Sequence, residues 1–584
     1  MNLSFQGLCK SYKGKTVFKN ITGKIEGQDK IGLIGVNGIG KTTLARILSG
    51  EEICDQGEIQ WVPSNTTILY IEQYPEFDSN VSVYEEIYRV AASGTHHHII
   101  DIETIVKMSL NKVGLDEKMW GLRALSLSGG EKTKLALCKA MVSSYDLLIL
   151  DEPTNHLDLK SYEWLEEFIR SINKPMLIIS HDRFFLDNVV SKIWELTSQR
   201  LSVYEGNYSA YKMQKENELT TITREYEKQH MEIRHLKKVI NERKNWYEGA
   251  HKAAGTNDFY RAKAKKHANV LKAKKKQLER IEKTKISKPE KNVSPGFQMI
   301  NKNTTGTRLP RFLVQGKNVS KSFGKKVILQ NTSFNIRRGD KIALIGENGV
   351  GKTTLLKMIC GIESYSGTIR INPSVKIGYF AQELDNLNND SSVLDDVLNA
   401  GTTVEDTMSI LAALLFRGEG VHQKIASLSM GEKGRVAFAK LILSGADLLI
   451  LDEPTNYMDI PSKEKIEDVL DEFMGSIIFV SHDRYLIQRL ANSVFVIDKQ
   501  NLYCYYGDYE YYIAKCREQM RREEVGVEYK DLADNIRRLE CELAFLGGKL
   551  NEVLDEEEKE MLSKKYLAAA KELNKQKKVL KKLK

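Results

Sequence analysis

The stretch Ile31-Gly-Leu-Ile-Gly35-Val-Asn-Gly-Ile-Gly40-Lys41-Thr42-Thr43 places a short apolar strand directly before a glycine-rich loop and the start of a helix. The same order of residues returns in residues 342–354, where the loop reads Gly346-Glu-Asn-Gly-Val-Gly351-Lys352-Thr353-Thr354. In such a loop, a P-loop, the glycines let backbone N–H groups curl around phosphate oxygens, and the helix dipole attracts the same negative charge. Two copies in one chain therefore predict two phosphate-binding units.

Three further motifs come after each P-loop, in the same order in both copies. They are Leu127-Ser128-Gly129-Gly130-Glu131, Leu147-Leu-Ile-Leu150-Asp151-Glu152 and Ser180-His181-Asp182 in the first copy, and Leu428-Ser429-Met430-Gly431-Glu432, Leu449-Ile-Leu451-Asp452-Glu453 and Ser481-His482-Asp483 in the second. Each of these three recurs after 301 residues, and the P-loop lysines lie 311 residues apart. Short β-branched strands alternate with helical segments through both copies, which predicts two α/β units with mainly parallel sheets.

The side chains in these motifs suit the hydrolysis of a nucleoside triphosphate. P-loop lysines neutralise the β- and γ-phosphates, and the threonine after each lysine ligates Mg²⁺. At the end of an apolar strand, an aspartate can hold the water shell of the metal, and the next glutamate can act as general base on the attacking water. The predicted catalytic residues are Glu152, Glu453, His181, His482, Gln73 and Gln382, and the predicted Mg²⁺ ligands are Thr42, Asp151, Gln73, Thr353, Asp452 and Gln382.

Length, apolar runs and cysteines narrow the class of protein. The 584 residues suit roughly two to four domains. The apolar runs are strand-sized, shorter than the roughly 18 residues that span a bilayer, and the N-terminus lacks the pattern of a signal peptide. We therefore expect a cytoplasmic protein. The seven cysteines are scattered without a C-x-x-C spacing, which favours reduced thiols over a zinc site.

The positive charge of the chain is concentrated between the two copies. The net charge is +9, but residues 212–291 hold 23 Lys and Arg against 11 Asp and Glu, so this segment carries +12 and the remainder −3. Such a block favours a polyanionic partner, with nucleic acid foremost, over the alternative of a solvated lysine-rich coiled coil.

Apolar residues in this basic segment have a helical period. Their steps of three or four residues, with one skipped position at Gln229, predict a helix over residues 210–248 that Gly249 and Gly255 interrupt. A second basic helix is predicted over residues 257–286, so that the two form an antiparallel hairpin on the order of 55 Å long. The predicted seam consists of Leu219, Ile222, Tyr226, Ile233, Leu236, Ile240 and Tyr247 on the first helix and Val270, Leu271, Leu278 and Ile281 on the second.

The last 70 residues repeat this pattern in a shorter form. Leucine and isoleucine recur every three or four residues from Leu532 to Leu550, and a lysine-rich helix comes after a turn near residues 554–556. A second, C-terminal helical hairpin is therefore predicted.

Together these motifs resemble those of the ATP-binding-cassette ATPases, and specifically the ABC-F family, which fuses two cassettes without a membrane domain. The resemblance covers about residues 1–515. It implies an α/β fold with two tandem ABC ATPase cassettes, at residues 1–208 and 311–515, joined by a basic helical-hairpin linker at residues 209–310 with its tip near 246–260. A C-terminal helical extension is expected at residues 516–584. The resemblance also implies a monomer whose cassettes form an intramolecular head-to-tail sandwich around two ATP molecules with Mg²⁺.

In that sandwich each ATP would lie between the P-loop of one cassette and the signature motif (residues 127–131 or 428–432) of the other, Lys41 facing Ser429 and Lys352 facing Ser128. Tyr12 and Phe323 match the aromatic residue that stacks on adenine, whereas Met430 departs from the Ser-Gly-Gly pattern and bears on whether the two sites hydrolyse at equal rates. The implied ATP-binding residues are Tyr12, Gly35, Asn37, Gly38, Gly40, Lys41, Thr42, Thr43, Ser128, Gly129, Gly130, Phe323, Gly346, Asn348, Gly349, Gly351, Lys352, Thr353, Thr354, Ser429 and Gly431.

The linker resembles the ABC-F hairpin that reaches into the tRNA exit site of the 70S ribosome. The implied partners are 23S rRNA and P-site tRNA, with neither membrane nor DNA involved. Lysines suit contact with RNA phosphates, and exposed aromatic rings suit stacking on bases, the alternative for each ring being packing at the turn of the hairpin. The expected RNA-contacting residues are Trp246, Tyr247, His251, Phe259, Tyr260, Arg261, Lys263, Lys265 and Lys266.

Two roles within the family remain open. Housekeeping members carry an extra arm between the glutamine and the signature motif, but Gln73 and Ser128 are 55 residues apart, against 47 for Gln382 and Ser429. Eight further residues leave no room for a helical arm. The absence of an arm, the extended linker tip and the C-terminal helical hairpin together resemble the antibiotic-resistance branch, which protects the ribosome from lincosamides, pleuromutilins and streptogramin A. The alternative is a drug-independent translation factor that modulates tRNA position or relieves stalling. A permease partner or a DNA-repair enzyme fits the chain less well.

Overall fold

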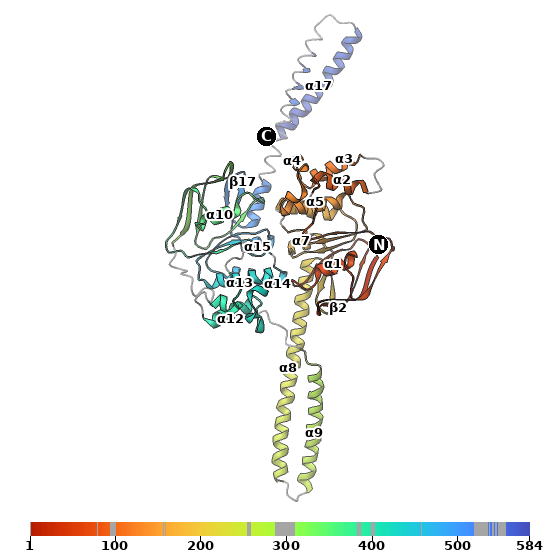
Figure 1. Ribbon diagram of the computed structural model, residues 1–584, viewed down its shortest axis with the longest axis vertical. Helices are drawn as coiled ribbons and strands as arrows, with labels where there is room; N and C mark the ends of the chain where they lie inside the picture. Colours follow the sequence, from red (N-terminus) through yellow and green to blue (C-terminus); the bar gives the residue numbers. More distant parts are fainter. Residues whose placement is uncertain are drawn as a thin grey trace.

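The computed structural model of the chain describes residues 2–78, 80–93, 101–155, 157, 159–253, 258–286, 310–381, 387–398, 403–456, 458–518 and 556–583, with residues 535, 536, 538, 539, 542, 543 and 546. Two α/β bodies lie side by side (Figure 1). A long helical hairpin extends from one end of this pair, and a C-terminal helix lies at the opposite end.

The core of the first cassette is a six-stranded sheet with the order β5-β6-β7-β3-β8-β9. All neighbouring strands are parallel except β8 and β9, which confirms the predicted α/β core. Every residue of β6 and β7 is buried, because helices and a second sheet cover both faces. The strands are β3 (Lys30–Ile34), β5 (Ile68–Ile71), β6 (Leu147–Asp151), β7 (Met176–Ile179), β8 (Lys192–Leu196) and β9 (Leu201–Glu205).

Two apolar layers enclose this sheet. On one face lie α1 (Lys41–Ser49) and an antiparallel sheet of order β2-β1-β4, where Phe5 packs edge-on against Trp194 with ring centroids 5.8 Å apart. The other face is covered by helices. The remaining elements are β1 (Asn2–Tyr12), β2 (Lys15–Glu26), β4 (Gln56–Val62), α2 (Val83–Ser93), α3 (Ile102–Lys112), α4 (Glu117–Trp120), η1 (Ala124–Ser126), α5 (Gly129–Val142), α6 (Leu159–Ser171) and α7 (Arg183–Val189).

The second cassette repeats the same architecture. Its sheets have the orders β14-β15-β16-β12-β17-β18 and β11-β10-β13. The strands are β10 (Phe312–Phe323), β11 (Lys326–Arg337), β12 (Lys341–Ile345), β13 (Ser366–Ile371), β14 (Ile377–Phe380), β15 (Leu448–Asp452), β16 (Ser476–Val480), β17 (Ser493–Asp498) and β18 (Asn501–Tyr505). The helices are α10 (Lys352–Ile359), α11 (Val393–Leu398), α12 (Val404–Ala413), η3 (Gly418–His422), η4 (Ile425–Ser427), α13 (Met430–Leu443), α14 (Ile460–Glu472) and α15 (Arg484–Leu490).

The predicted hairpin between the cassettes consists of α8 (Tyr208–Ala253) and α9 (Asp258–Lys283). Its seam holds at Ile233, Leu236 and Ile240, which are buried. Gln229, the skipped position of the apolar pattern, closes the base of the hairpin: its amide donates to Thr284 O at 2.9 Å and accepts from Ile286 N at 2.8 Å. The residue that interrupts the apolar pattern is thus the one that hydrogen-bonds the residues just after α9.

Parts of the hairpin prediction are wrong. Leu219 and Ile222 are 46% and 43% exposed, because they precede Gln229 and α9 does not reach them. Val270 is also exposed, on the outer face of α9. Helix α8 continues through Gly249 to Ala253, since one glycine costs a long helix only about 1 kcal/mol. Gly255 lies outside the described residues.

The C-terminal segment is described mainly through α17 (Glu556–Leu583). Ile536, Leu539 and Leu546, three members of the predicted apolar pattern, are buried, as is Ala569 of α17. Within the described ranges, no helix is both long and apolar enough to cross a membrane. Cys9, Cys54, Cys138, Cys360, Cys504 and Cys516 are free thiols.

Candidate active site

Each P-loop bends at a glycine that no other residue could replace without strain. Gly40 has φ 101° and a Cβ there would lie 2.4 Å from the side chain of Val17, while Gly351 has φ 108° and a Cβ would lie 2.2 Å from that of Ile328. Each glycine caps the helix after it. The tight bend therefore brings the backbone N–H groups at the start of α1 and α10 to the phosphate-binding loop.

The P-loop lysines bridge their own loops. Lys41 Nζ donates to the carbonyl oxygens of Gly35 at 2.9 Å and Val36 at 3.2 Å, and Lys352 Nζ donates to those of Gly346 at 2.8 Å and Glu347 at 2.9 Å. Burial lowers the pKa of Lys41, which the nearby Glu152 carboxylate raises in part. Both ammonium groups are thus held beside the phosphate-binding loop, where their positive charge would stabilise a bound phosphate anion.

The two glutamates at the ends of the buried strands have a left-handed backbone. Glu152 has φ 48° and Glu453 φ 50°, and their N–H groups donate to Ile179 O at 2.8 Å and Val480 O at 3.0 Å. A non-glycine residue in this conformation costs on the order of 1–3 kcal/mol. The same strained turn in both copies places each glutamate after its strand, in the lining of one cavity.

A histidine faces each glutamate. Nε2 of His181 lies 3.5 Å from Glu152 Oε1, and Nε2 of His482 lies 3.5 Å from Glu453 Oε1. Burial raises the pKa of Glu152 to about 7, and burial together with Lys41 lowers the pKa of His181 well below its usual range. His181 is therefore neutral near pH 7, and the raised pKa of Glu152 suits a general base.

Several buried carboxylate oxygens of these motifs have no hydrogen-bond partner among the described residues. They are Asp151 Oδ1, Glu152 Oε1, Asp452 Oδ2 and Glu453 Oε1. The other oxygen of Asp151 accepts from Tyr70 OH at 3.2 Å, and burial raises the pKa of this aspartate. Buried anionic oxygens without partners fit a divalent cation with its water shell, and Thr42 and Gln73 line the same cavity.

One cavity of about 1030 Å³ joins most of the predicted site residues. Its lining includes both P-loops, Tyr12, Phe323 and the second signature residues Ser429, Met430 and Gly431. Ser128, Gly129 and Gly130 of the first signature are not part of this lining. Both signature serines form reciprocal caps with the glutamate three residues later, Ser128 with Glu131 and Ser429 with Glu432. Gln382 lies outside the described residues.

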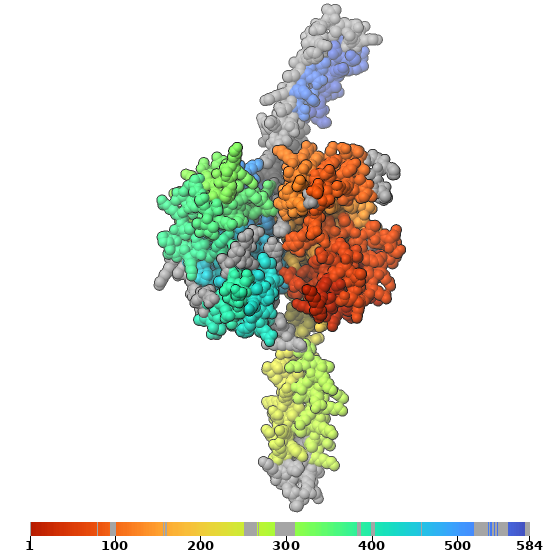
Figure 2. Space-filling model, in the orientation of Figure 1, coloured from red at the N-terminus to blue at the C-terminus, as the bar shows by residue number. Residues whose placement is uncertain are grey.

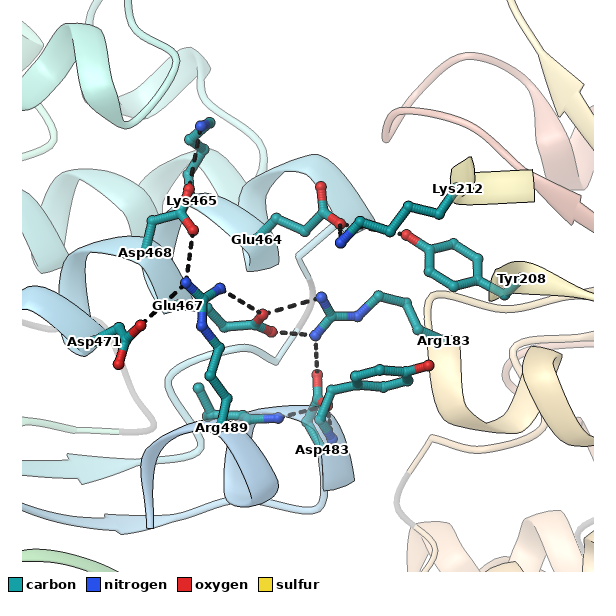
Figure 3. Close-up of polar contacts among 12 residues, drawn as sticks. Arg183, Tyr208, Lys212, Glu464, Lys465, Glu467, Asp468, Asp471, Asp483 and Arg489 are labelled. Carbon is teal, nitrogen blue, oxygen red and sulfur yellow. Dashed lines mark hydrogen bonds and ion pairs between the residues drawn. The ribbon is translucent and has the colours of Figure 1, made fainter. Parts of the chain in front are cut away.

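The cavity is bounded by contacts that cross from one cassette to the other. Asn37 N of the first P-loop donates to Asp459 Oδ2 at 3.1 Å, and Lys463 Nζ donates to His181 O at 3.1 Å. Arg183, next to Asp182, forms two hydrogen bonds with Glu467 of α14 and lies 3.5 Å from Asp483. Figure 3 shows the contacts of Arg183 with Glu467 and Asp483.

Helix α14 also contacts the root of the linker. Glu464 Oε1 lies 3.5 Å from Tyr208 OH and 3.4 Å from Lys212 Nζ, both in the first turns of α8 (Figure 3). The sequence predictions did not include Tyr70, Asp459, Lys463, Arg183 or Glu467. Only Arg183, which follows Asp182, adjoins one of the motifs, and each of the five has a partner in another element.

At the far end of α8, Trp246 is 44% exposed and Tyr247 is half-buried. Lys265 and Lys266 of α9 are exposed. The side chains of the other expected RNA-contacting residues lie outside the described residues, and they are His251, Phe259, Tyr260, Arg261 and Lys263.

Comparison with known proteins places the chain among related sequences and folds. A family model described as ABC transporter matches residues 18–155 and 329–456, and a second with the same description matches residues 194–297. ABC transporter F family member 5 of Arabidopsis thaliana is 33% identical over 557 residues, 88% of this chain and 77% of the relative. The ribosome protection protein VmlR of Bacillus subtilis is 34% identical over 499 residues, 84% of this chain and 85% of VmlR. In fold, the chain is similar to the solved RNase-L Inhibitor, with a TM-score of 0.57 at 17% identity, over 86% of this chain and 90% of that one.

Proposed function

The chain belongs to the ABC-F family of two-cassette ATP-binding proteins, and we propose that it is a ribosome-binding ATPase that enters the tRNA exit site and displaces antibiotics from the peptidyl-transferase centre. As a family member it binds and hydrolyses ATP. The ribosome as partner is supported by the relative named a ribosome protection protein. Such a role places the protein in the cytoplasm.

The hydrolytic chemistry proposed for each site is based on the geometry. In the first site, Lys41 binds the phosphates, Glu152 accepts a proton from the attacking water, and the neutral His181 imidazole hydrogen-bonds the γ-phosphate. In the second site, Lys352, Glu453 and His482 take these roles. Mg²⁺, held by Thr42 and Asp151 or by Thr353 and Asp452, would neutralise the phosphate charge. The signature serines supply the opposite face of each nucleotide, Ser429 in the first site and Ser128 in the second.

The single observation that carries the proposed ribosome role is the basic hairpin of α8 and α9, which extends beyond both cassettes from its root at the start of α8 (Figure 2). At 1.5 Å per residue the 46 residues of α8 span on the order of 70 Å. Exposed lysines cover the outer side of α9, and exposed Trp246 lies near the tip. A long basic arm ending in an aromatic residue suits a deep RNA-walled channel.

The resistance role rests on the segment between β5 and α5 in the first cassette. The described helices of this segment are short, with α2 and α3 of 11 residues and α4 of four. They pack on the cassette itself, which supports the absence of an additional arm.

Contact of Glu464 with the root of α8 gives ATP-driven cassette closure a direct route to the hairpin.

A trapping experiment tests this function. The Glu152→Gln/Glu453→Gln variant keeps the shape of both sites but removes the general bases, so with ATP it should remain bound to ribosomes through a sucrose cushion. The same variant with ADP is the control and should dissociate. Equal release with ATP and ADP would contradict an ATP-gated ribosome cycle. Trapping without any effect on drug binding would instead favour the drug-independent translation factor.

A further inference from the structure

Helix α14 of the second cassette extends into the first nucleotide site. Its cap, Asp459, accepts hydrogen bonds from Ser462 N in its own first turn and from Asn37 N in the first P-loop, both at 3.1 Å. Ile460, at the start of the helix, is 7% exposed and belongs to the apolar core of the first cassette. The beginning of α14 is thus fixed to the first cassette rather than only to its own.

Lys463, one turn after Asp459, continues this contact. Its ammonium donates to the backbone carbonyl of His181 at 3.1 Å and lies 3.8 Å from Asp483 Oδ2, and its side chain is only 12% exposed. The second cassette therefore holds the backbone of the histidine that faces Glu152.

The residue that corresponds to Lys463 in the other half of the repeat is not a cation. The residue 301 positions earlier, in the same place of the repeat, is Tyr162. Tyr162 is 3% exposed, packs edge-on against Phe185 with centroids 5.6 Å apart, and carries the Arg484 guanidinium 5.4 Å above its ring. A neutral aromatic ring thus lines the cavity where the other half of the repeat provides an ammonium group.

We propose that Lys463 is a positioning residue that acts from the second cassette on hydrolysis at the first ATP site, and that the second site, with Tyr162 in its place, lacks this control. The hydrogen bond to His181 O fixes the turn between β7 and α7, and so the imidazole relative to Glu152. Separation of the cassettes removes the ammonium from that carbonyl. Hydrolysis at the first site therefore depends on cassette closure more than hydrolysis at the second. This inference rests on the proposed roles of Glu152 and His181.

Two backgrounds isolate the sites for a kinetic test. The Glu453→Gln chain retains only the first general base, and the Glu152→Gln chain only the second. In the Glu453→Gln chain, Lys463→Met should lower kcat about tenfold, the effect of one charge-assisted hydrogen bond that acts on the transition state, with little change in KM for ATP. Lys463→Arg should restore most of the rate. In the Glu152→Gln chain Lys463→Met should lower kcat clearly less, because Lys463 hydrogen-bonds the histidine of the first site and makes only a longer contact, 3.8 Å, with Asp483.

Lys465→Met is the matched control, because Lys465 lies on the same helix but pairs with Asp468 of α14 at 3.3 Å. A second measurement does not depend on turnover. In the Glu152→Gln/Glu453→Gln chain with ATP, amide hydrogen exchange over residues 180–183 should be faster after Lys463→Met and unchanged after Lys465→Met.

The outcomes separate this inference from the proposed function. Unchanged kcat in the Glu453→Gln chain after Lys463→Met, or an equal loss in both backgrounds without rescue by arginine, would overturn the positioning role alone. If the Glu453→Gln and Glu152→Gln chains hydrolyse ATP as fast as the unmodified chain before Lys463 is changed, the assignment of the general bases is wrong instead.

Discussion

The buried ion pair between the cassettes predicts a large cost for one small substitution. Arg183 of the first cassette and Glu467 of the second are 4% and 3% exposed and share two hydrogen bonds. Breaking such a buried pair costs about 3–5 kcal/mol, because one charge remains without its partner. Glu467→Gln preserves the shape, and Arg183 keeps Asp483 at 3.5 Å, so we expect the lower end of that range.

Because the two partners belong to different cassettes, the cost applies to the closed arrangement. About 3 kcal/mol corresponds to a closed-to-open ratio roughly 100-fold lower. The ratio can be measured by energy transfer between one dye on each cassette during an ATP titration. Glu163→Gln is the control, because Glu163 is 66% exposed and its pair with Arg484, at 3.2 Å, should contribute less than about 1 kcal/mol.

A double-mutant cycle isolates the pair. Arg183→Met and Glu467→Gln should show a coupling energy of about 2–3 kcal/mol, whereas additive effects are expected of sites that do not interact. Two results would refute the importance of this pair for closure. One is a Glu467→Gln chain that closes as well as the Glu163→Gln chain, and the other is a coupling energy under about 1 kcal/mol.

Four further outcomes are expected from the described geometry. Gly40→Ala forces a Cβ into the Val17 side chain at φ 101°, so nucleotide binding by the first P-loop should fall at least tenfold. This binding can be measured with a fluorescent ATP analogue in a chain whose second P-loop lysine is replaced. Gln229→Ala removes both hydrogen bonds at the hairpin base and should speed amide exchange in the last turn of α9 without changing ATPase activity. Hydrogen bonds from Thr67 lower the pKa of Asp146, so the stability that these bonds contribute is present above about pH 4 and is lost as the pH falls below that value. Asp146→Asn should therefore make the free energy of unfolding in urea less dependent on pH below about pH 4. Lys265→Ala should reduce the salt dependence of ribosome binding by about one counterion, and an unchanged slope would exclude a phosphate contact.

Local patterns predicted most of the fold. The P-loops, the buried strands ending in Asp-Glu and the helical hairpin all depend on residues close in sequence, and the structure contains each of them. Errors arose where length decided the outcome. The apolar pattern of α8 extends beyond the part of α8 that α9 reaches, so Leu219 and Ile222 remain exposed. The long helix also tolerates Gly249.

Apart from the hydrogen bond of Tyr70 to Asp151, the parts of the site that the sequence did not reveal are the contacts between cassettes. Lys463 is one lysine among many on a charged helix, and its role depends on a carbonyl 282 residues away in the chain. Glu467 and Arg183 likewise resemble surface charges until α14 is packed against α7. Repeat spacing shows which residues correspond, but only the packing shows that Tyr162 and Lys463 differ in what they contact.

The central claim, ATP-driven protection of the ribosome, is tested most directly by growth inhibition in a drug-sensitive bacterium that expresses this chain. The panel would contain lincosamides, pleuromutilins, streptogramin A and, as a control, a drug that binds far from the peptidyl-transferase centre. We expect resistance to one or more of the first three drugs only, lost in the Glu152→Gln/Glu453→Gln variant at equal expression. Unchanged inhibition by every drug, with the protein expressed and bound to ribosomes, would contradict the claim.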